Sequence, residues 1–320
     1  MTKSQIRVAV LDDFQDVARS FADWGSLEPR AVTTVFADNV TGEALVQRLQ
    51  PFDVITLIRE RTKLPRALIG RLPNLKLVVT AGMRNLGIDL AACTERGIVV
   101  CGTDTGSNPT AELAFGMLLA LSRHVVAEDR ALREGHWQTR LGFGVKGTTL
   151  GILGLGRLGS QMAGYARAFG MNVIAWSQNL TDARAAEAGA RRVDKAELFA
   201  RADFVSLHLI LSERTRGVVG AAEVALMKPS AFLINTSRAG LVDEAALIGA
   251  LERGQIAGAA LDVYEVEPLP PDAAVRRAPN TILTPHLGYA TRDSYRVYFP
   301  HAVEDIAAWL DGKPIRSLEG

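Results

Sequence analysis

The sequence Thr149-Leu-Gly-Ile-Leu-Gly-Leu-Gly-Arg-Leu-Gly159 decides the fold class of this chain. An apolar run typical of a buried strand leads into a G-x-G-x-x-G motif, and a segment able to form a helix follows. In this setting Gly154 permits a tight turn, Gly156 lets the backbone approach a pyrophosphate, and Gly159 allows close packing of helix and strand. Free N–H groups and the helix dipole then bind the anion. The motif predicts a Rossmann-type dinucleotide-binding unit; a flexible turn without a ligand is the alternative.

Strands and helices alternate on both sides of this motif, which predicts βαβ units and parallel sheets. The predicted strands are Ile6–Leu11, Ala31–Phe36, Phe52–Ile58, Leu75–Thr80, Thr149–Leu153, Asn172–Trp176, Asp203–Leu207, Ala231–Asn235, Gly258–Asp262 and Thr281–Thr284. Helices are expected over Phe14–Trp24, Thr110–Arg123 and Thr291–Leu310. The first ~100 residues therefore form a small doubly wound α/β domain, and a Rossmann-type domain follows.

Length, charge and cysteine content exclude several protein classes. A chain of 320 residues suggests two domains. Lys plus Arg (36) nearly equals Asp plus Glu (35), so no basic surface for nucleic acid is expected. The longest apolar stretch, Leu113–Leu121, is too short to span a membrane, and no secretory signal precedes it. Cys93 and Cys101 can build neither a disulfide framework nor a zinc site, so we expect no metal and a reducing compartment, the cytoplasm.

Three polar segments follow predicted strands of the second domain and converge at one sheet edge, where ligands of open α/β sheets bind. They contribute Arg238, Glu267 and His286. The arginine fork suits a carboxylate, the imidazole titrates near neutral pH, and Glu267 can orient that imidazole. Each residue also has a structural alternative: a surface ion pair for Arg238, a turn before Pro268 for Glu267, and a structural histidine for His286.

The end of the second Rossmann strand bears on cofactor choice. An acidic residue about 20 residues after the glycine motif binds the ribose of NAD. Ser177 occupies that place, followed by Gln178 and Asn179, so nothing repels a 2′-phosphate. We predict that the chain uses NAD or NADP with a slight preference for NADPH, although Arg184 is the nearest arginine that could contact the phosphate.

The chain resembles the NAD(P)-dependent D-isomer-specific 2-hydroxyacid dehydrogenases over nearly its whole length. The shared motifs, in order, are Leu153–Gly159, Asn235–Gly240, Leu261–Pro268 and Pro285–Gly288. The resemblance implies that Arg238, Glu267 and His286 are catalytic. It also implies that a set of residues binds the cofactor. These are the three glycines of the motif, Gly154, Gly156 and Gly159, together with Arg157, Leu158, Ser177, Leu209, Thr236, Ser237, Asp262 and Gly288.

The resemblance also implies the domain organisation and the assembly. A flavodoxin-like substrate domain is formed by residues 1–101 and 290–320, and the NAD(P)-binding Rossmann domain spans residues 102–289. A turn-rich connection, Gly102–Pro109, separates the two. Members of the family form homodimers through the larger domain, and Leu113–Leu121 is apolar on more sides than one buried helix face requires.

Two departures from the family pattern concern the substrate. The family's substrate loop carries two glycines, whereas this chain has Gly82-Met83-Arg84, with arginine in place of the second glycine. Arg84 can contact an acidic substrate or point into solvent. Arg59 matches a family arginine that faces the substrate, so we assign Arg59, Gly82, Met83 and Arg84 to substrate binding. The family's proline after His208-Leu209 is also absent.

We therefore predict an oxidoreductase that interconverts a small D-2-hydroxy acid and its 2-keto acid, of the glyoxylate or hydroxypyruvate kind, with His286 as acid and base. One alternative is a dinucleotide-sensing protein of the corepressor type, which can share this fold. A second is formate or phosphite oxidation, but formate dehydrogenases of this fold carry Gln where Glu267 stands. The chain ends soon after Leu310, so the serine-regulated form of phosphoglycerate dehydrogenase is not expected.

Overall fold

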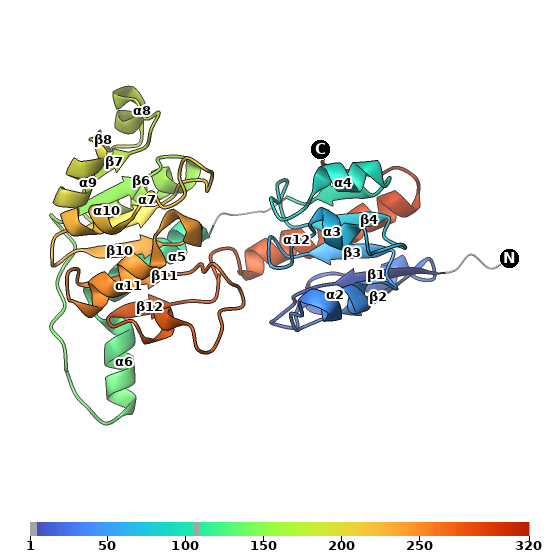
Figure 1. The fold of residues 1–320 in the computed structure, drawn as a ribbon, viewed down its shortest axis with the longest axis horizontal. Helices are drawn as coiled ribbons and strands as arrows, with labels where there is room; N and C mark the ends of the chain where they lie inside the picture. Colours follow the sequence, from blue (N-terminus) through green and yellow to red (C-terminus); the bar gives the residue numbers. More distant parts are fainter. Residues whose placement is uncertain (1–4, 105–108, 320) are drawn as a thin grey trace. The chain divides into compact units, whose positions relative to one another are not determined.

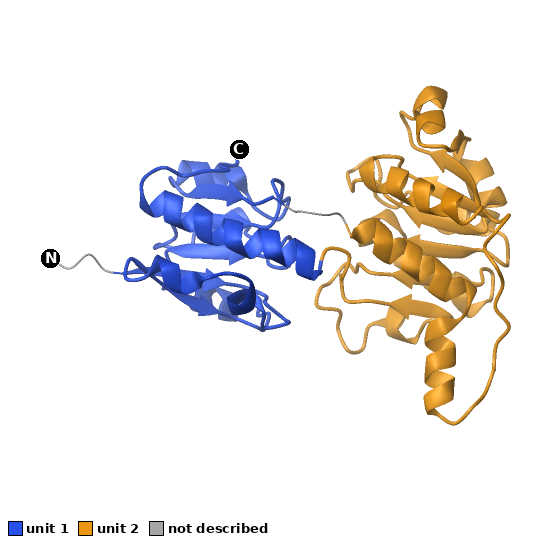
Figure 2. Cartoon of the chain, turned by 180° about the vertical axis from the view of Figure 1, so that it is seen from behind, with its two compact units in different colours: residues 1–107, 290–320 blue, residues 108–289 orange. Residues whose placement is uncertain are grey.

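The computed structural model describes residues 5–104 and 109–319. The chain forms two compact units, which Figure 2 colours separately. Unit 1 comprises residues 1–107 and 290–320, and unit 2 comprises residues 108–289. Part of the predicted connection Gly102–Pro109, residues 105–108, lies outside the described residues.

Unit 1 is built on a five-stranded parallel sheet in the order β2-β1-β3-β4-β5. Its strands are β1 (Ile6–Val10), β2 (Ala31–Val35), β3 (Val54–Leu57), β4 (Leu77–Thr80) and β5 (Val99–Gly102). This order is that of flavodoxin-like folds, and it confirms the predicted fold class of the smaller domain.

The helices of unit 1 come from both ends of the chain (Figure 1). They are α1 (Ala18–Phe21), α2 (Gly42–Leu49), α3 (Arg66–Ile69), α4 (Leu90–Glu95) and α12 (Arg292–Leu310), with a 3₁₀ turn η1 (Trp24–Leu27). The long helix α12 packs on this sheet, where its Tyr298 hydroxyl donates to the Leu57 carbonyl at 3.1 Å. Phe299 of α12 is fully buried and its ring lies edge-on to Trp24.

Unit 2 is built on a seven-stranded sheet in the order β12-β11-β10-β9-β6-β7-β8, with parallel pairs throughout. The strands are β6 (Thr149–Leu153), β7 (Asn172–Trp176), β8 (Arg191–Arg192), β9 (Phe204–Leu207), β10 (Phe232–Asn235), β11 (Gly258–Leu261) and β12 (Thr281–Leu283). The strand order reverses between β6 and β9, as in a Rossmann fold, which confirms the predicted class.

Helices cover both faces of this sheet, and a separate hydrophobic core lies on each face. Along each strand, successive side chains point to opposite faces. Ile152, Ala175, Phe204 and Ile234 pack in one core with helices α5 (Thr110–Ser122) and α7 (Arg157–Ala168). Leu153, Ile174, Val205 and Leu233 pack in the other with α9 (Lys195–Arg201), α10 (Ala221–Leu226) and α11 (Glu244–Glu252).

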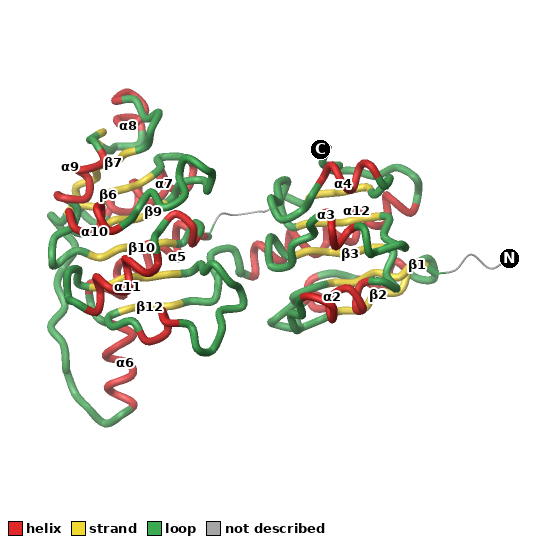
Figure 3. Tube along the Cα trace, in the orientation of Figure 1, coloured by secondary structure: helices red, strands yellow, loops and turns green. Residues whose placement is uncertain are grey.

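Several elements differ from the sequence prediction. The sequence did not predict strands β5 and β8, or helices α6 (Val125–Arg133) and α8 (Asp182–Glu187). The helix predicted over Phe14–Trp24 is wrong in extent, because the backbone at Asp12 and Asp16 has positive φ (60° and 50°) and α1 begins only at Ala18. After α6 the chain continues as the long loop of residues 134–148 (Figure 3).

No single helix in the described part of the chain is long and apolar enough to cross a membrane. Helices α5 and α6 pass that test only as a pair, bent by 61°. Helix α5 buries much of its surface in the core of unit 2, including Ala114, Phe115 and Leu118.

Candidate active site

The glycine motif forms an open cradle between β6 and α7. Gly154 has φ +96°, and a Cβ there would lie 2.7 Å from the His208 carbonyl oxygen. A Cβ at Gly159 would lie 2.1 Å from the Gly154 carbonyl, whereas a Cβ at Gly156 would meet nothing within 4 Å. Thus two glycines permit close packing, and Gly156 leaves space at the helix N-terminus, where no side chain caps the backbone. This geometry fits a dinucleotide pyrophosphate.

Ser177 directly follows β7, and its carbonyl accepts a hydrogen bond from the Leu180 N–H at 3.1 Å. The helix α8 that follows carries Arg184, whose guanidinium reaches back toward the cradle. Arg184 Nη2 lies 3.5 Å from the Ser160 hydroxyl in the first turns of α7, and Nη1 lies 3.0 Å from Glu187. The segment after β7 therefore places a guanidinium beside the first turns of α7.

The loop after β10 is folded by Asn235, a residue that the sequence analysis did not assign to the site. Its amide donates to the Arg238 carbonyl at 2.9 Å and accepts from the Ser237 N–H at 3.0 Å. The Ser237 hydroxyl donates to the Leu209 carbonyl at 2.8 Å, which joins this loop to the segment after β9. The Thr236 hydroxyl is buried and has no hydrogen-bond partner among the described residues. A buried hydroxyl of this kind fits a bound polar cofactor.

Asp262 follows β11 and holds the segment after β12. Its carboxylate accepts from the Thr284 hydroxyl at 2.5 Å, from the Leu287 N–H at 2.7 Å and from the Gly288 N–H at 2.8 Å. Burial raises the pKa of this carboxyl, and the three hydrogen bonds oppose that rise without cancelling it. Asp262 thus shapes the loop that carries His286.

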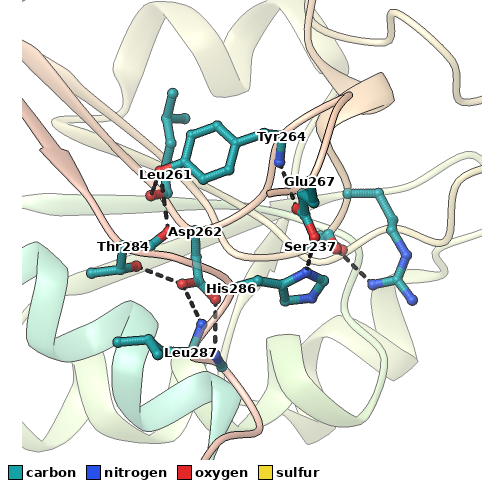
Figure 4. A network of polar contacts seen from close by, with 10 residues as sticks. Ser237, Leu261, Asp262, Tyr264, Glu267, Thr284, His286 and Leu287 are labelled. Atoms are coloured by element: carbon teal, nitrogen blue, oxygen red, sulfur yellow. Dashed lines mark hydrogen bonds and ion pairs between the residues drawn. The ribbon is translucent and has the colours of Figure 1, made fainter. Parts of the chain in front are cut away.

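Glu267 and His286 form the closest acid–base pair of the site (Figure 4). Glu267 Oε2 lies 2.6 Å from His286 Nδ1, and Oε1 accepts from the Tyr264 N–H at 2.8 Å. Both side chains are mostly buried, with 21% of the His286 side chain and 27% of the Glu267 side chain exposed. The sequence grouped Arg238 with this pair, and the charge of Arg238 acts on the Glu267 carboxyl.

The protonation of this pair follows from the donors and acceptors. Burial alone raises the pKa of Glu267, but the hydrogen bond and charge of His286, with the Tyr264 N–H, lower it below its ordinary value. An ionised carboxylate can only accept hydrogen bonds, so Nδ1 of His286 must carry the proton. Nε2 is then the ring atom that can exchange a proton with another molecule.

His208 lies after β9 with its Nε2 2.8 Å from the Ser206 hydroxyl. Burial lowers the pKa of His208 to about 4, so this ring is neutral at pH 7. Its ring has a hydroxyl partner, and it forms no hydrogen bond or ion pair with a carboxylate of the described residues. His208 therefore lacks a carboxylate partner of the kind that Glu267 provides for the His286 ring.

The four residues predicted to bind substrate all belong to unit 1. Arg59 has φ +58°, and its Nη1 lies 3.4 Å from the Ala81 carbonyl. Gly82 is buried with φ +88°, and its N–H donates to the Thr103 hydroxyl. Met83 and Arg84 are exposed. Their role toward a substrate stays a prediction.

No group of three or more His, Cys, Asp or Glu side chains within residues 5–104 and 109–319 is arranged to hold a metal ion. The site consists of the glycine cradle, polar loops and one imidazole–carboxylate pair. The chain thus has the fold and cradle of the Rossmann class of dinucleotide-binding proteins.

Comparison with known proteins identifies the family more closely. Residues 115–288 match the family described as D-isomer specific 2-hydroxyacid dehydrogenase, NAD binding domain. A glyoxylate reductase of Thermococcus litoralis is 37% identical over 280 residues, which cover 84% of each chain. The crystal structure of a phosphoglycerate oxidoreductase from Vibrio cholerae superposes with a TM-score of 0.91 at 39% identity, covering 96% of this chain and 100% of that one.

A D-3-phosphoglycerate dehydrogenase of Methanocaldococcus jannaschii is 36% identical over 313 residues. This match covers 96% of the present chain but 58% of the relative, so the chain spans little more than half the length of that protein. Two further phosphoglycerate dehydrogenases are covered to 59% and 50%. The chain belongs to the D-isomer specific 2-hydroxyacid dehydrogenase family, as its sequence motifs predicted.

The structure adds positioning contacts that the sequence analysis missed. Asn235, Tyr264 and Thr284 each contact a predicted site residue or its loop. All three lie inside or beside the motifs that carried the resemblance, so their position was visible. Their contacts were not, because these depend on how neighbouring strand ends pack.

Proposed function

We propose that this protein is an enzyme that transfers a hydride between a nicotinamide cofactor and a small D-2-hydroxy acid or its 2-keto acid. The observation that carries the proposal is the 2.6 Å contact between His286 Nδ1 and Glu267 Oε2, at the same sheet edge as the glycine cradle. The names of the relatives, which are dehydrogenases and reductases, support the same class of reaction.

The acid–base step follows from the protonation of the pair. In reduction, the His286 imidazolium, which carries a proton on each ring nitrogen, donates its Nε2 proton to the substrate oxygen as the carbonyl becomes a hydroxyl. In oxidation, Nε2 takes that proton back, and the ionised Glu267 stabilises the imidazolium. The nicotinamide, when bound, supplies or accepts the hydride. Arg238 binds the substrate carboxylate and polarises the carbonyl.

The direct test of this function is an absorbance assay of NADH and NADPH oxidation with glyoxylate, hydroxypyruvate and pyruvate. We expect turnover with at least one 2-keto acid, and a panel of kcat/KM values ranks the substrates. Cofactor binding without turnover on any 2-keto acid would favour the dinucleotide sensor. Cofactor reduction by formate or phosphite alone would favour the second alternative.

The role of Arg238 is tested by Arg238→Lys, which keeps the charge but loses the planar fork. We expect both a higher KM and a lower kcat for the 2-keto acid. A variant with unchanged constants would show that Arg238 is structural and that Arg59 or Arg84 holds the carboxylate.

We further propose that the cradle accepts NADH and NADPH with similar affinity and a modest preference for NADPH. No carboxylate at Ser177 repels a 2′-phosphate, and its hydroxyl can donate to a phosphate oxygen. The guanidinium of Arg184, 3.5 Å from the Ser160 hydroxyl, supports a contact with that phosphate.

We propose that the partner at unit 2 is a second copy of the chain. Helix α6 has no buried residue, and the loop after it exposes 77% of Trp137 and 95% of Leu141. A groove of about 870 Å³ lies between α6 and residues 276–283. Such exposed apolar surface is typical of an interface. Light scattering should give twice 34.5 kDa, and a mass of 34.5 kDa at micromolar concentration would contradict the dimer.

We place the protein in the cytoplasm. Cys93 and Cys101 are buried free thiols, and burial raises the pKa of each to about 11. Protonated thiols suit a reducing compartment. Fractionation of cells with a tagged full-length chain tests this placement.

A further inference from the structure

We propose that Tyr264 is a positioning residue whose hydroxyl and backbone N–H together fix the His286–Glu267 pair. This inference depends on the proposed function only for its kinetic readout. Figure 4 shows Tyr264 beside the ends of β11 and β12, between Leu261 and Glu267.

The Tyr264 hydroxyl joins the two strand ends. It lies 3.0 Å from the Leu261 carbonyl, the last residue of β11, and 3.1 Å from the Thr284 carbonyl, just after β12. The Thr284 N–H also donates to the Leu261 carbonyl, at 3.0 Å. A phenol has one proton to donate, so the two carbonyls share it. The hydroxyl thus holds the strands together one residue beyond the end of their ladder.

The same Thr284 carbonyl anchors the turn that presents His286. The His286 N–H donates to it at 3.0 Å, and His286 has φ +55°. This left-handed backbone is unfavourable for a residue other than glycine, so contacts from outside the turn must hold it. Tyr264 supplies one of them through its hydroxyl.

The backbone of Tyr264 acts on the other member of the pair. Its N–H donates to Glu267 Oε1 at 2.8 Å, which leaves Oε2 for His286 Nδ1 at 2.6 Å. One residue therefore contacts the Glu267 carboxylate directly and the backbone of His286 through the Thr284 carbonyl. A movement of Tyr264 changes the distance between the two.

The phenol is suited to this role and not to proton transfer. The Tyr264 side chain is buried, and burial, with the charges of Asp262 and Glu267, raises the pKa of the hydroxyl. The group stays protonated near neutral pH and acts as a donor. Its partners are the carbonyls of Leu261 and Thr284.

The test uses Tyr264→Phe, which removes one oxygen and keeps the ring. The matched control is Tyr298→Phe in unit 1, which also loses a buried hydroxyl bound to a carbonyl, Leu57, at 3.1 Å. Thermal unfolding of both variants checks that their loss of stability is comparable. If Tyr264→Phe loses more stability than Tyr298→Phe, the two variants are compared at a temperature where both are fully folded.

The first readout is NMR of 15N-histidine-labelled protein. A short N–H···O⁻ bond places the Nδ1 proton far downfield, and the signal is assigned by its loss in His286→Gln. We expect Tyr264→Phe to shift or weaken this signal and to change the ring 15N shifts, and Tyr298→Phe to leave both unchanged. These signals do not depend on turnover.

The second readout is steady-state kinetics with the best 2-keto acid. We expect Tyr264→Phe to lower kcat by roughly 10- to 100-fold while KM and the cofactor Kd stay within about twofold. An unchanged imidazole signal would overturn the positioning role, whether or not kcat falls. A changed imidazole signal in a protein without turnover on any 2-keto acid would retain it and reject the proposed function instead.

Discussion

The two units share a parallel, doubly wound sheet but differ in the first turn at the point where the strand order reverses. In unit 2 this turn is Gly154–Gly159, and α7 begins without a side-chain cap. In unit 1 the corresponding residues are Asp12 and Asp13. Asp13 Oδ2 accepts from the Ala18 N–H of α1 at 2.7 Å, and Asp12 accepts from Asn39 and Thr62, each at 2.7 Å.

This difference separates what topology decides from what side chains decide. Topology places a helix N-terminus at the edge of each sheet, where anions bind. In unit 1 the Asp13 carboxylate accepts a backbone N–H of α1 near that edge, and Asp12 accepts from the side chains of Asn39 and Thr62. In unit 2 the space beside Gly156 is open. The turn between the first strand and the first helix is thus filled by the protein's own aspartates in unit 1, whereas in unit 2 it leaves space for a dinucleotide.

The largest expected effect is on kcat, and it is tested by comparing one imidazole–carboxylate pair in each unit. His286→Gln should lower kcat by about 10²–10⁴-fold with the cofactor Kd unchanged, because the proton donor is lost. The control in unit 1 is His301→Gln, since His301 Nδ1 lies 3.7 Å from Asp104 Oδ2. Equal losses in the two variants would contradict a catalytic pair confined to unit 2.

The next effect concerns the open cradle. Gly159→Ala should raise the Kd for NADH by about 100-fold, because the new Cβ would lie 2.1 Å from the Gly154 carbonyl and displace the turn. The control is Gly164→Ala on the same helix, where a Cβ meets nothing within 4 Å. Fluorescence titration measures both values. Wild-type affinity in Gly159→Ala would remove the glycine motif from cofactor binding.

The two units should also respond oppositely to acid at one group each. Burial lowers the pKa of His208 to about 4 from 6.5. As pH falls, the unfolded chain therefore binds a proton at His208 before the folded protein does. The contribution of His208 to the free energy of unfolding falls as pH drops from 6.5 to 4. Burial raises the pKa of Asp305 in unit 1 to about 7 from 3.8, in spite of Arg316. Its contribution therefore falls as pH rises from 3.8 to 7.

Urea unfolding from pH 4 to 7.5 tests this contrast. Relative to wild type, His208→Gln should gain stability toward low pH, by about 2 kcal/mol after allowance for the intermediate burial of the residue. Asp305→Asn should gain relative stability toward pH 7. Parallel pH profiles for the two variants would contradict the opposite signs.

The smallest expected effect is on cofactor choice. Wild-type kcat/KM for NADPH and NADH should differ by no more than about tenfold. Ser177→Asp should shift the ratio toward NADH by adding a charge that repels a 2′-phosphate. Ser177→Ala, which adds no charge, serves as the control. A wild-type preference for NADH well over about a hundredfold would show that another residue sets the choice.

Sequence reasoning worked where local pattern and fold agree. Apolar strands such as Thr149–Leu153 and Asn172–Trp176 begin and end as predicted, because they are buried on both faces and their borders carry glycine or polar residues. The residues Glu267 and His286 were paired from strand-end logic alone, and the structure brings them to 2.6 Å.

Where prediction failed, the missing information was tertiary. Helix α6 has no buried residue, so it carries no core-facing stripe to detect. Helix α1 begins only at Ala18, where the Asp13 carboxylate accepts the backbone N–H, a contact that no periodicity reveals. The positioning contacts of Asn235 and Tyr264 depend on which strand ends become neighbours.

The arrangement of unit 1 along the chain has a consequence for the order of folding during synthesis. Residues 108–289 form unit 2 as one continuous stretch, whereas unit 1 needs residues 290–320 in addition to the first 107. Tyr298 and Phe299 of α12 are buried in unit 1 and emerge from the ribosome after all of unit 2. Since domains tend to fold as they are made, we expect unit 1 to be completed only after unit 2, with its sheet lacking α12 until residues 290–320 have been synthesised.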